Sequence, residues 1–166
     1  SAGTRAEEGL ESDRAVRPVG SAAPLALAVS GVEWKRKLNQ AQDEEAFAAA
    51  MKNYLRRKEE PPSDPYLRDR VLKVADVFML DEDGLLHREW HRDPRPSSKI
   101  EPVLQAYIPP ALRGEVLKSS HGGLRTGHLS ALKTWQRLRE RAYWPGMYAD
   151  VYAHVKACGV CQTRGG

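Results

Sequence analysis

The chain has 166 residues, of which 41% are hydrophobic, and a formal net charge of +4. This length provides one modest hydrophobic core or two small ones. No apolar run is long enough to span a membrane, and the first residues lack the basic-then-apolar order of a signal peptide, so we expect no membrane partner. Because the chain opens with Ser1 and not with Met, we expect a fragment of a longer protein.

The charge is unevenly distributed along the chain. From Ala111 to the end there are nine Lys or Arg against three Asp or Glu, a net charge of +6, whereas residues 1–110 carry a net charge of −2. A basic surplus confined to one segment is typical of a part that meets phosphates. The alternative is that these basic residues only keep helix faces solvated.

The N-terminal third is predicted to contain a tail followed by helix. Residues 1–31 mix Gly, Ser, Ala, Pro and charge without a sustained period, which predicts a disordered tail. Residues 32–65 are interpreted as a helical extension and linker, because apolar residues recur at roughly helical spacing from Glu33 to Lys58 before a Pro-rich stretch. We expect Trp34 to be a packing anchor of this helix.

Residues 66–108 are predicted to form a small β-hairpin or three-stranded sheet. The strands are expected at residues 74–80, 85–90 and 103–108. The acidic stretch from Asp81 to Gly84 joins the first two; it lacks the remaining ligands of a calcium loop and is interpreted as a plain turn. His87 and His91 are expected to be polar surface residues and not metal ligands.

Four residues near the C-terminus have the composition of a metal site. His121 and His128 are separated by six residues, and Cys158 and Cys161 by two. Two imidazoles and two thiolates suit the tetrahedral coordination of Zn²⁺. The alternative is a free cysteine pair, or a disulfide, with two unrelated histidines. If all four residues bind one Zn²⁺, no position remains for an activated water, so the zinc would be structural and not catalytic.

Residues 109–163, which contain these ligands, are predicted to form three helices. The first begins at Pro109 and Pro110, runs to about Ser120 and delivers His121 at its end, the second covers about residues 129–142, and the third begins near Met147. The fold class is therefore mainly α: a zinc-stabilised three-helix bundle, helix-turn-helix-like, after the small sheet and the N-terminal helix. Zinc is expected to supply folding energy that so small a core lacks.

Helical spacing assigns a core side to the second and third helices. In the second helix one arc holds the core residues and the opposite arc holds a basic ridge, Lys133, Arg137 and Arg141. The expected core residues of the two helices are Leu132, Trp135, Leu138, Ala142, Tyr148, Val151, Tyr152 and Val155. His154 points away from this stripe and is interpreted as exposed.

The ligands lie within a longer recognisable pattern. It comprises Gly127-His128, Lys133-Thr134, the block Tyr143-Trp144-Pro145-Gly146-Met147, Asp150-Val151, Val155-Lys156 and finally Cys158-x2-Cys161-Gln162. Over roughly residues 103–163 this pattern resembles the zinc-binding N-terminal domain of retroviral and retrotransposon integrases, with gypsy-type elements closest in pattern. The resemblance implies a fragment of a Pol polyprotein.

The resemblance implies an accessory role in DNA integration. Such a domain binds the double-stranded DNA ends of the element and helps integrase subunits assemble, in the host nucleus with a cytoplasmic particle stage. Catalysis belongs to an RNase-H-like core that would follow Gln162, so the chain alone is not expected to be an enzyme. We expect phosphate contacts from Arg125, Lys133, Arg137 and Arg141, with less weight on Arg139, Lys156 and Arg164.

A second hypothesis is a domesticated zinc module that acts mainly in protein–protein assembly. Its core would be built in the same way, and Trp135, Trp144 and Tyr148 would form an exposed docking patch. The plainer interpretation, which we favour, is that these aromatic residues fill the small core. Charge reversal at Lys133 and Arg137 distinguishes the two functions, because DNA binding needs the basic ridge and assembly does not.

Overall fold

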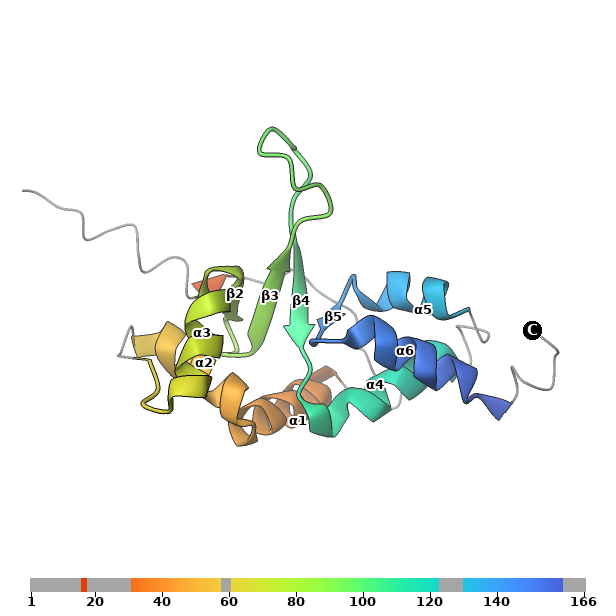
Figure 1. The fold of residues 1–166 in the computed structure, drawn as a ribbon, viewed down its shortest axis with the longest axis horizontal. Coiled ribbons are helices and arrows are strands. Elements are labelled where there is room, and N and C mark those ends of the chain that lie inside the picture. The colour runs from red at the N-terminus through yellow and green to blue at the C-terminus, as the bar shows by residue number, and fades with distance from the viewer. Residues whose placement is uncertain (1–15, 18–30, 58–60, 123–129, 160–166) are drawn as a thin grey trace, which may run out of the picture.

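A computed structural model describes residues 16–17, 31–57, 61–122 and 130–159. These residues form a mainly helical molecule with one small sheet (Figure 1). The helices are α1 (Gly31–Glu44), α2 (Ala46–Arg57), α3 (Pro65–Val74), the 3-10 helix η2 (Ala75–Val77), α4 (Pro110–Gly122), α5 (Ala131–Leu138) and α6 (Met147–Lys156). The strands are β1 (Val16–Arg17), β2 (Phe78–Asp81), β3 (Leu86–Trp90), β4 (Val103–Tyr107) and β5 (Ala142–Tyr143). No helix in the described ranges has the length and apolar content needed to cross a membrane.

The sheet joins the two halves of the chain. Its strand order is β1-β2-β3-β4-β5, with antiparallel pairing in the centre and a short parallel strand at each edge. The edge strand β5 belongs to the C-terminal segment that carries the predicted ligands. Its ladder is made by the Ala106 amide, which donates to the Arg141 carbonyl at 2.7 Å, and the Ile108 amide, which donates to the Tyr143 carbonyl at 3.0 Å. The C-terminal segment is therefore hydrogen-bonded directly to the strands that precede it.

The helix predicted for residues 33–58 is divided in two at Glu45. One oxygen of the Glu45 carboxylate accepts from the Ala48 amide at 3.0 Å, which satisfies an N–H group at the start of α2. The other oxygen accepts from the Tyr107 hydroxyl at 2.9 Å. Glu45 thus starts a new helix and ties it to β4, a tertiary contact that the helical periodicity does not reveal.

The strand predicted at residues 74–80 is wrong over its first half. Residues 65–74 form α3, which begins with Pro65 in the first turn and with the Asp64 carboxylate accepting from the Leu67 amide at 3.2 Å. The strand itself starts at Phe78. The prediction of a turn after it is confirmed: the Asp81 side chain accepts from the amides of Asp83 and Leu85, each at 2.9 Å, and Gly84 has the positive φ of 78° that the turn requires.

His87 is buried, contrary to the predicted surface position, whereas His91 is exposed as predicted. The Nδ1 atom of His87 lies 3.1 Å from the Leu85 carbonyl and 3.7 Å from the Asp81 carboxylate. Burial, which disfavours the charged imidazolium, lowers the pKa of His87, although the Asp81 carboxylate opposes this effect. Leu85, Leu86 and His87 are buried in succession, so both faces of the sheet are covered at the start of β3, which the residue types alone do not predict.

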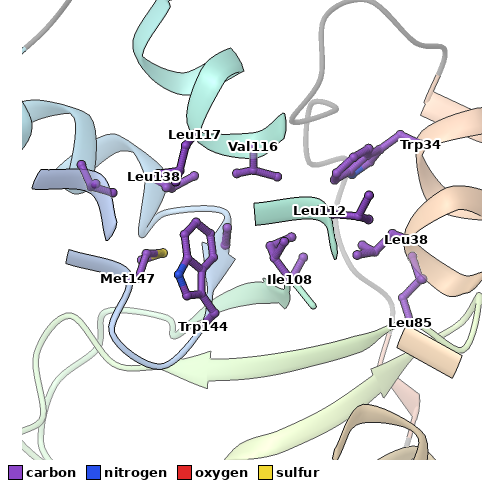
Figure 2. Packing of buried hydrophobic residues seen from close by; sticks show 13 residues of the cluster. Trp34, Leu38, Leu85, Ile108, Leu112, Val116, Leu117, Leu138, Trp144 and Met147 are labelled. Atoms are coloured by element: carbon purple, nitrogen blue, oxygen red, sulfur yellow. The ribbon is translucent and has the colours of Figure 1, made fainter. Parts of the chain in front are cut away.

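One hydrophobic cluster extends from α1 to α6. Figure 2 shows Trp34 and Leu38 of α1 beside Leu112 of α4, with Trp144 and Met147 at the other end of the same cluster. Its buried members are Trp34, Leu38, Leu85, Ala106, Ile108, Leu112, Val116, Leu117, Leu138, Ala142, Trp144, Met147 and Val151. The prediction that Trp34 is a packing anchor is confirmed. The core of the ligand-bearing segment is consequently completed by residues from the N-terminal half.

A second cluster packs α2 and α3 on the sheet. The rings of Phe47, Phe78 and Tyr107 meet edge to face with centroids 5.5–6.1 Å apart. Beside them, the buried amide of Gln42 donates to the carbonyls of Leu86 and Tyr107 at 3.2 and 2.8 Å and accepts from the Leu86 amide at 2.9 Å. This satisfied polar contact sets the position of α1 against β3 and β4.

The predicted disordered tail, residues 1–31, lies outside the described residues except for β1 and the first residue of α1. In β1, Val16 pairs with Leu80 and Arg17 with Asp81 of β2. The connection between β3 and β4, residues 91–102, projects away from the helices in Figure 1. Its base is held to the C-terminal segment by an ion pair between Arg92 and Glu140.

Candidate metal centre and nucleic-acid interface

The first predicted ligand, His121, lies in the last turn of α4. Its side chain is 1% exposed, because it follows the buried residue Leu117 at the spacing of four that keeps helix residues on one side. The helix extends two residues beyond its predicted end at Ser120, so His121 is part of the helix and not a residue after it. The second predicted ligand, His128, lies outside the described residues.

The third predicted ligand, Cys158, follows the end of α6 and is half-buried. Its amide donates to the Val155 carbonyl at 3.1 Å, which continues the last turn of the helix. The fourth predicted ligand, Cys161, lies outside the described residues, as does Arg125. His154, one turn before Cys158, is half-buried and not exposed as predicted, because its ring meets that of His121 with centroids 5.9 Å apart.

The two described ligand candidates therefore come from helix ends that lie close together. An imidazole and a thiol are ligand types that Zn²⁺ accepts, and the burial of His121 suits a site closed to solvent. Among the described residues no three His, Cys, Asp or Glu side chains are grouped so as to hold a metal ion. The described part thus contains two of the four predicted ligands, and His128 and Cys161 lie outside the described residues.

A hydrogen bond between Trp144 and Asp150 fixes the chain that leads into α6. The Trp144 indole N–H donates to the Asp150 carboxylate at 2.7 Å, and the indole is almost completely buried. Gly146 precedes the helix with a φ of 78°, a conformation that favours glycine. The Tyr-Trp-Pro-Gly-Met block thereby acts as a structural corner between β5 and α6. The expectation that Trp144 fills the core is confirmed.

The second helix of the segment is shorter than predicted. It covers Ala131–Leu138, where the prediction was 129–142, because residues 139–141 turn and residues 142–143 join the sheet as β5. The Ser130 hydroxyl accepts from the Lys133 amide at 3.3 Å and caps the start of the helix. The basic ridge is confirmed as a surface feature: Lys133, Arg137 and Arg141 are all exposed.

The predicted core positions are only partly right. Leu138, Ala142 and Val151 are buried, and Trp135 and Val155 are half-buried. The predictions for Leu132, Tyr148 and Tyr152 are wrong, since these side chains are 50%, 46% and 52% exposed. Thr134 and Met147 are buried instead. In each helix the observed buried positions are shifted by about one residue from the predicted ones. A helical wheel does not resolve so small a shift in a short helix.

Arg139 has a structural position that sequence reasoning missed. Its guanidinium lies between two indole rings, 4.8 Å from the Trp90 centroid and 4.5 Å from the Trp135 centroid. Its carbonyl accepts from the Gln105 side chain at 2.6 Å. Arg139 therefore joins the end of α5 to β3 and β4. No local pattern signals this contact, because the partners come from distant strands.

Comparison with known proteins finds similarity in the C-terminal segment. Residues 108–166 match the family described as the integrase zinc binding domain. The zinc finger and BTB domain-containing protein 11 of Mus musculus is 24% identical over 124 residues, which cover 73% of this chain and 11% of that protein. No solved structure matches the chain. The family match contains the zinc-binding domain and not a catalytic core. The segment that follows β4, residues 108–166, is thus similar to the zinc-binding domain of integrases.

Proposed function

We propose that this chain is a zinc-stabilised accessory module of the integrase type that binds double-stranded DNA through the exposed side of α5. The observation that carries the proposal is the position of Lys133, Arg137 and Arg141. All three are exposed, Lys133 and Arg137 on α5 and Arg141 in the turn that follows it, while Thr134 and Leu138 on the other side of α5 are buried. A helix that is buried on one side and carries exposed cations on the other is suited to phosphate contacts.

The acidic residues nearest in the chain do not neutralise this ridge. Glu140 forms an ion pair with Arg92, and Asp150 accepts the hydrogen bond of Trp144. Within the described residues, the side chains of Lys133, Arg137 and Arg141 form no ion pair. The ridge therefore keeps its positive charge available to DNA, and each phosphate contact would add to an affinity that falls with rising salt.

The zinc in this proposal is one structural ion, held by His121, His128, Cys158 and Cys161. It would join the end of α4 to the region after α6 and close the loop that separates the histidines from the cysteines. With four protein ligands its role is to hold the helices in place and to supply no catalytic water. DNA ends, other integrase subunits and a nuclear location are the partners and the setting proposed for this module.

The test is charge reversal on α5. The double variant Lys133→Glu/Arg137→Glu is compared with Arg36→Glu/Arg68→Glu, which changes the total charge equally at exposed positions of α1 and α3. Binding of a fluorescent 30-base-pair duplex is measured by anisotropy at several salt concentrations. We expect the α5 variant to lose at least tenfold in affinity, and the control less than threefold. Equal losses in the two variants would show that only net charge matters and would contradict the proposed site.

A second candidate function is protein–protein assembly. It is favoured by the exposed side chains of Leu132, Tyr148 and Tyr152, which lie on two helices that pack together, with Trp135 stacked edge to face on Tyr148 at 5.2 Å. The name of the mouse relative also describes a protein outside the integrases. Under this function, Tyr148→Ser/Tyr152→Ser would abolish self-association or partner binding, whereas Lys133→Glu/Arg137→Glu would leave it intact.

A further inference from the structure

A small cavity lies at the junction of the N-terminal half and the C-terminal segment, away from α5. Its volume is about 170 Å³, and its apolar lining consists of the rings of Phe47, Phe78 and Tyr143 with Val74 and Pro145. Phe47, Val74 and Phe78 come from α2, α3 and β2. The other two residues belong to β5 and to the corner before α6, so the cavity exists only where the two halves of the chain meet.

The size of the cavity limits what it can hold. A dry cavity of roughly 150 Å³ accommodates a benzene ring, whereas sites for complete small-molecule ligands start at about 300 Å³. The 170 Å³ of this cavity therefore match one apolar side chain and not a whole cofactor. The phenyl and phenol rings of the lining favour an aromatic or branched aliphatic group.

Two cations complete the lining, Arg70 and Lys73 of α3. The Arg70 guanidinium lies 4.6 Å from the centroid of Phe47 and 5.8 Å from that of Tyr66. Within the described residues Arg70 has no ion-pair partner. Lys73 pairs with Asp69 at 2.9 Å, but both side chains are largely exposed, so this pair is weak and exchangeable.

The positive charge continues around the opening. Arg88 of β3 lies over the ring of Tyr143 at 4.2 Å, and its own hydrogen bond goes to the neutral side chain of Gln105. No carboxylate of the described residues lines the cavity. The carboxylate of Glu45, just before α2, accepts from Tyr107 and Ala48. An apolar group that enters the cavity would thus lie beside cations. A ligand that complements the cavity therefore has an apolar side chain with negatively charged groups next to it.

We propose that this cavity is the docking site of an acidic peptide segment of a partner protein, which places one aromatic or branched aliphatic side chain in the cavity against Phe47, Phe78 and Tyr143. Carboxylates that flank the inserted side chain contact Arg70 and Lys73. The exposed ring of Tyr66 extends the surface along α3. The site is independent of the basic ridge on α5, so it is able to engage a protein while the ridge engages DNA.

The test uses the full chain and a fluorescein-labelled eight-residue peptide with one Phe among Asp and Glu residues. Two further peptides carry Gly in place of Phe, or Lys in place of the acidic residues. We expect saturable binding of the first peptide, at least tenfold weaker binding of the Gly peptide, and none of the Lys peptide. Equal affinity for the Phe and Gly peptides would overturn the proposal, because it would mean that the cavity holds no side chain.

Variants of α3 locate the binding. Lys73→Glu and Arg70→Gln are expected to weaken binding at least tenfold, and Val74→Phe is expected to fill the cavity and to abolish binding. Arg68→Glu, an exposed residue outside the lining, is the matched control and is expected to leave binding within twofold. Because Lys73 is exposed, its substitution keeps the test valid if the Val74 variant does not fold.

Two further outcomes would contradict the site. Equal losses in Lys73→Glu and Arg68→Glu would indicate attraction by net charge alone. Displacement of the peptide by single- or double-stranded DNA in the Lys133→Glu/Arg137→Glu variant would assign the cavity to nucleic acid. Unchanged peptide binding in that α5 variant is the expected result, and it separates this proposal from the fate of the DNA-binding proposal.

Discussion

The imidazole rings of His121 and His154 meet edge to face, with centroids 5.9 Å apart and planes at 89°. This contact brings the last turn of α4 against the last turn of α6. Cys158 follows one turn later in the chain, so the contact places a predicted histidine ligand and a predicted cysteine ligand in the same region. The approach of these two helix ends is the structural basis of the proposed zinc centre.

The shared hydrophobic core predicts that residues of α1 stabilise the C-terminal segment. We expect Leu38→Ala to cost about 2–5 kcal/mol of unfolding free energy, because Leu38 is fully buried in the cluster that contains Trp144. The control is Val32→Ala, at a side chain that is 79% exposed, with an expected effect within about 0.5 kcal/mol. Urea unfolding followed by circular dichroism and by tryptophan fluorescence measures both. Two separate transitions, with only one moved by Leu38→Ala, would contradict a shared core.

The hydrogen bond from Trp144 to Asp150 predicts a cost for removing its acceptor. Asp150→Ala leaves a buried indole N–H without its partner, so we expect a loss of about 1–3 kcal/mol. Asp76→Ala, at an exposed aspartate of η2, is the control and should change stability little. The same urea experiment reads out both variants. A loss in Asp150→Ala no larger than in the control would show that the bond does not hold the corner before α6.

The buried His87 predicts a dependence of stability on pH. Burial lowers its pKa in the folded state, so the unfolded chain binds the proton more readily. The contribution of the neutral His87 side chain to stability is complete above the unfolded-state pKa of about 6.5. This contribution is lost as the pH falls below that value toward the pKa of His87 in the folded state. We expect His87→Gln to flatten this part of the stability profile measured by urea unfolding between about pH 7 and 5. His91→Gln, at an exposed histidine, is the matched control. A slope in His87→Gln that equals that of the natural chain would refute the assignment.

Much of the fold is predictable from local chemistry, and the errors have identifiable physical causes. The turn before Leu85 follows from an acidic stretch ending in Gly84, and the start of α6 follows from Pro145 and Gly146. Helix α3 was missed because its Pro65 start and its short apolar pattern were not distinguishable from the linker before it. The side of the helix that packs inward was missed for Leu132 and Tyr148, because that choice depends on neighbours far away in the sequence.

The candidate site likewise has features that local sequence predicts and contacts that it does not predict. The residue types and spacing of His121 and Cys158 are enough to indicate a metal site, and the charges of Lys133 and Arg137 are enough to indicate an exposed ridge. The position of Arg139 between two tryptophans and the contact of His154 with His121 arise only from tertiary packing. Contacts of this kind leave no periodic signal in the chain.

We propose that one structural zinc ion holds the C-terminal helices together. The most direct test is to measure zinc per chain by atomic absorption, and far-UV circular dichroism before and after chelation, for the natural chain and for His121→Ala and Cys158→Ser. We expect one zinc per chain, loss of helix on chelation, and reduced zinc in both variants. Cys158→Ser and the chelated chain are also expected to lose affinity for DNA. A chain that contains no zinc, or whose helix content does not change on chelation, would contradict a structural zinc ion.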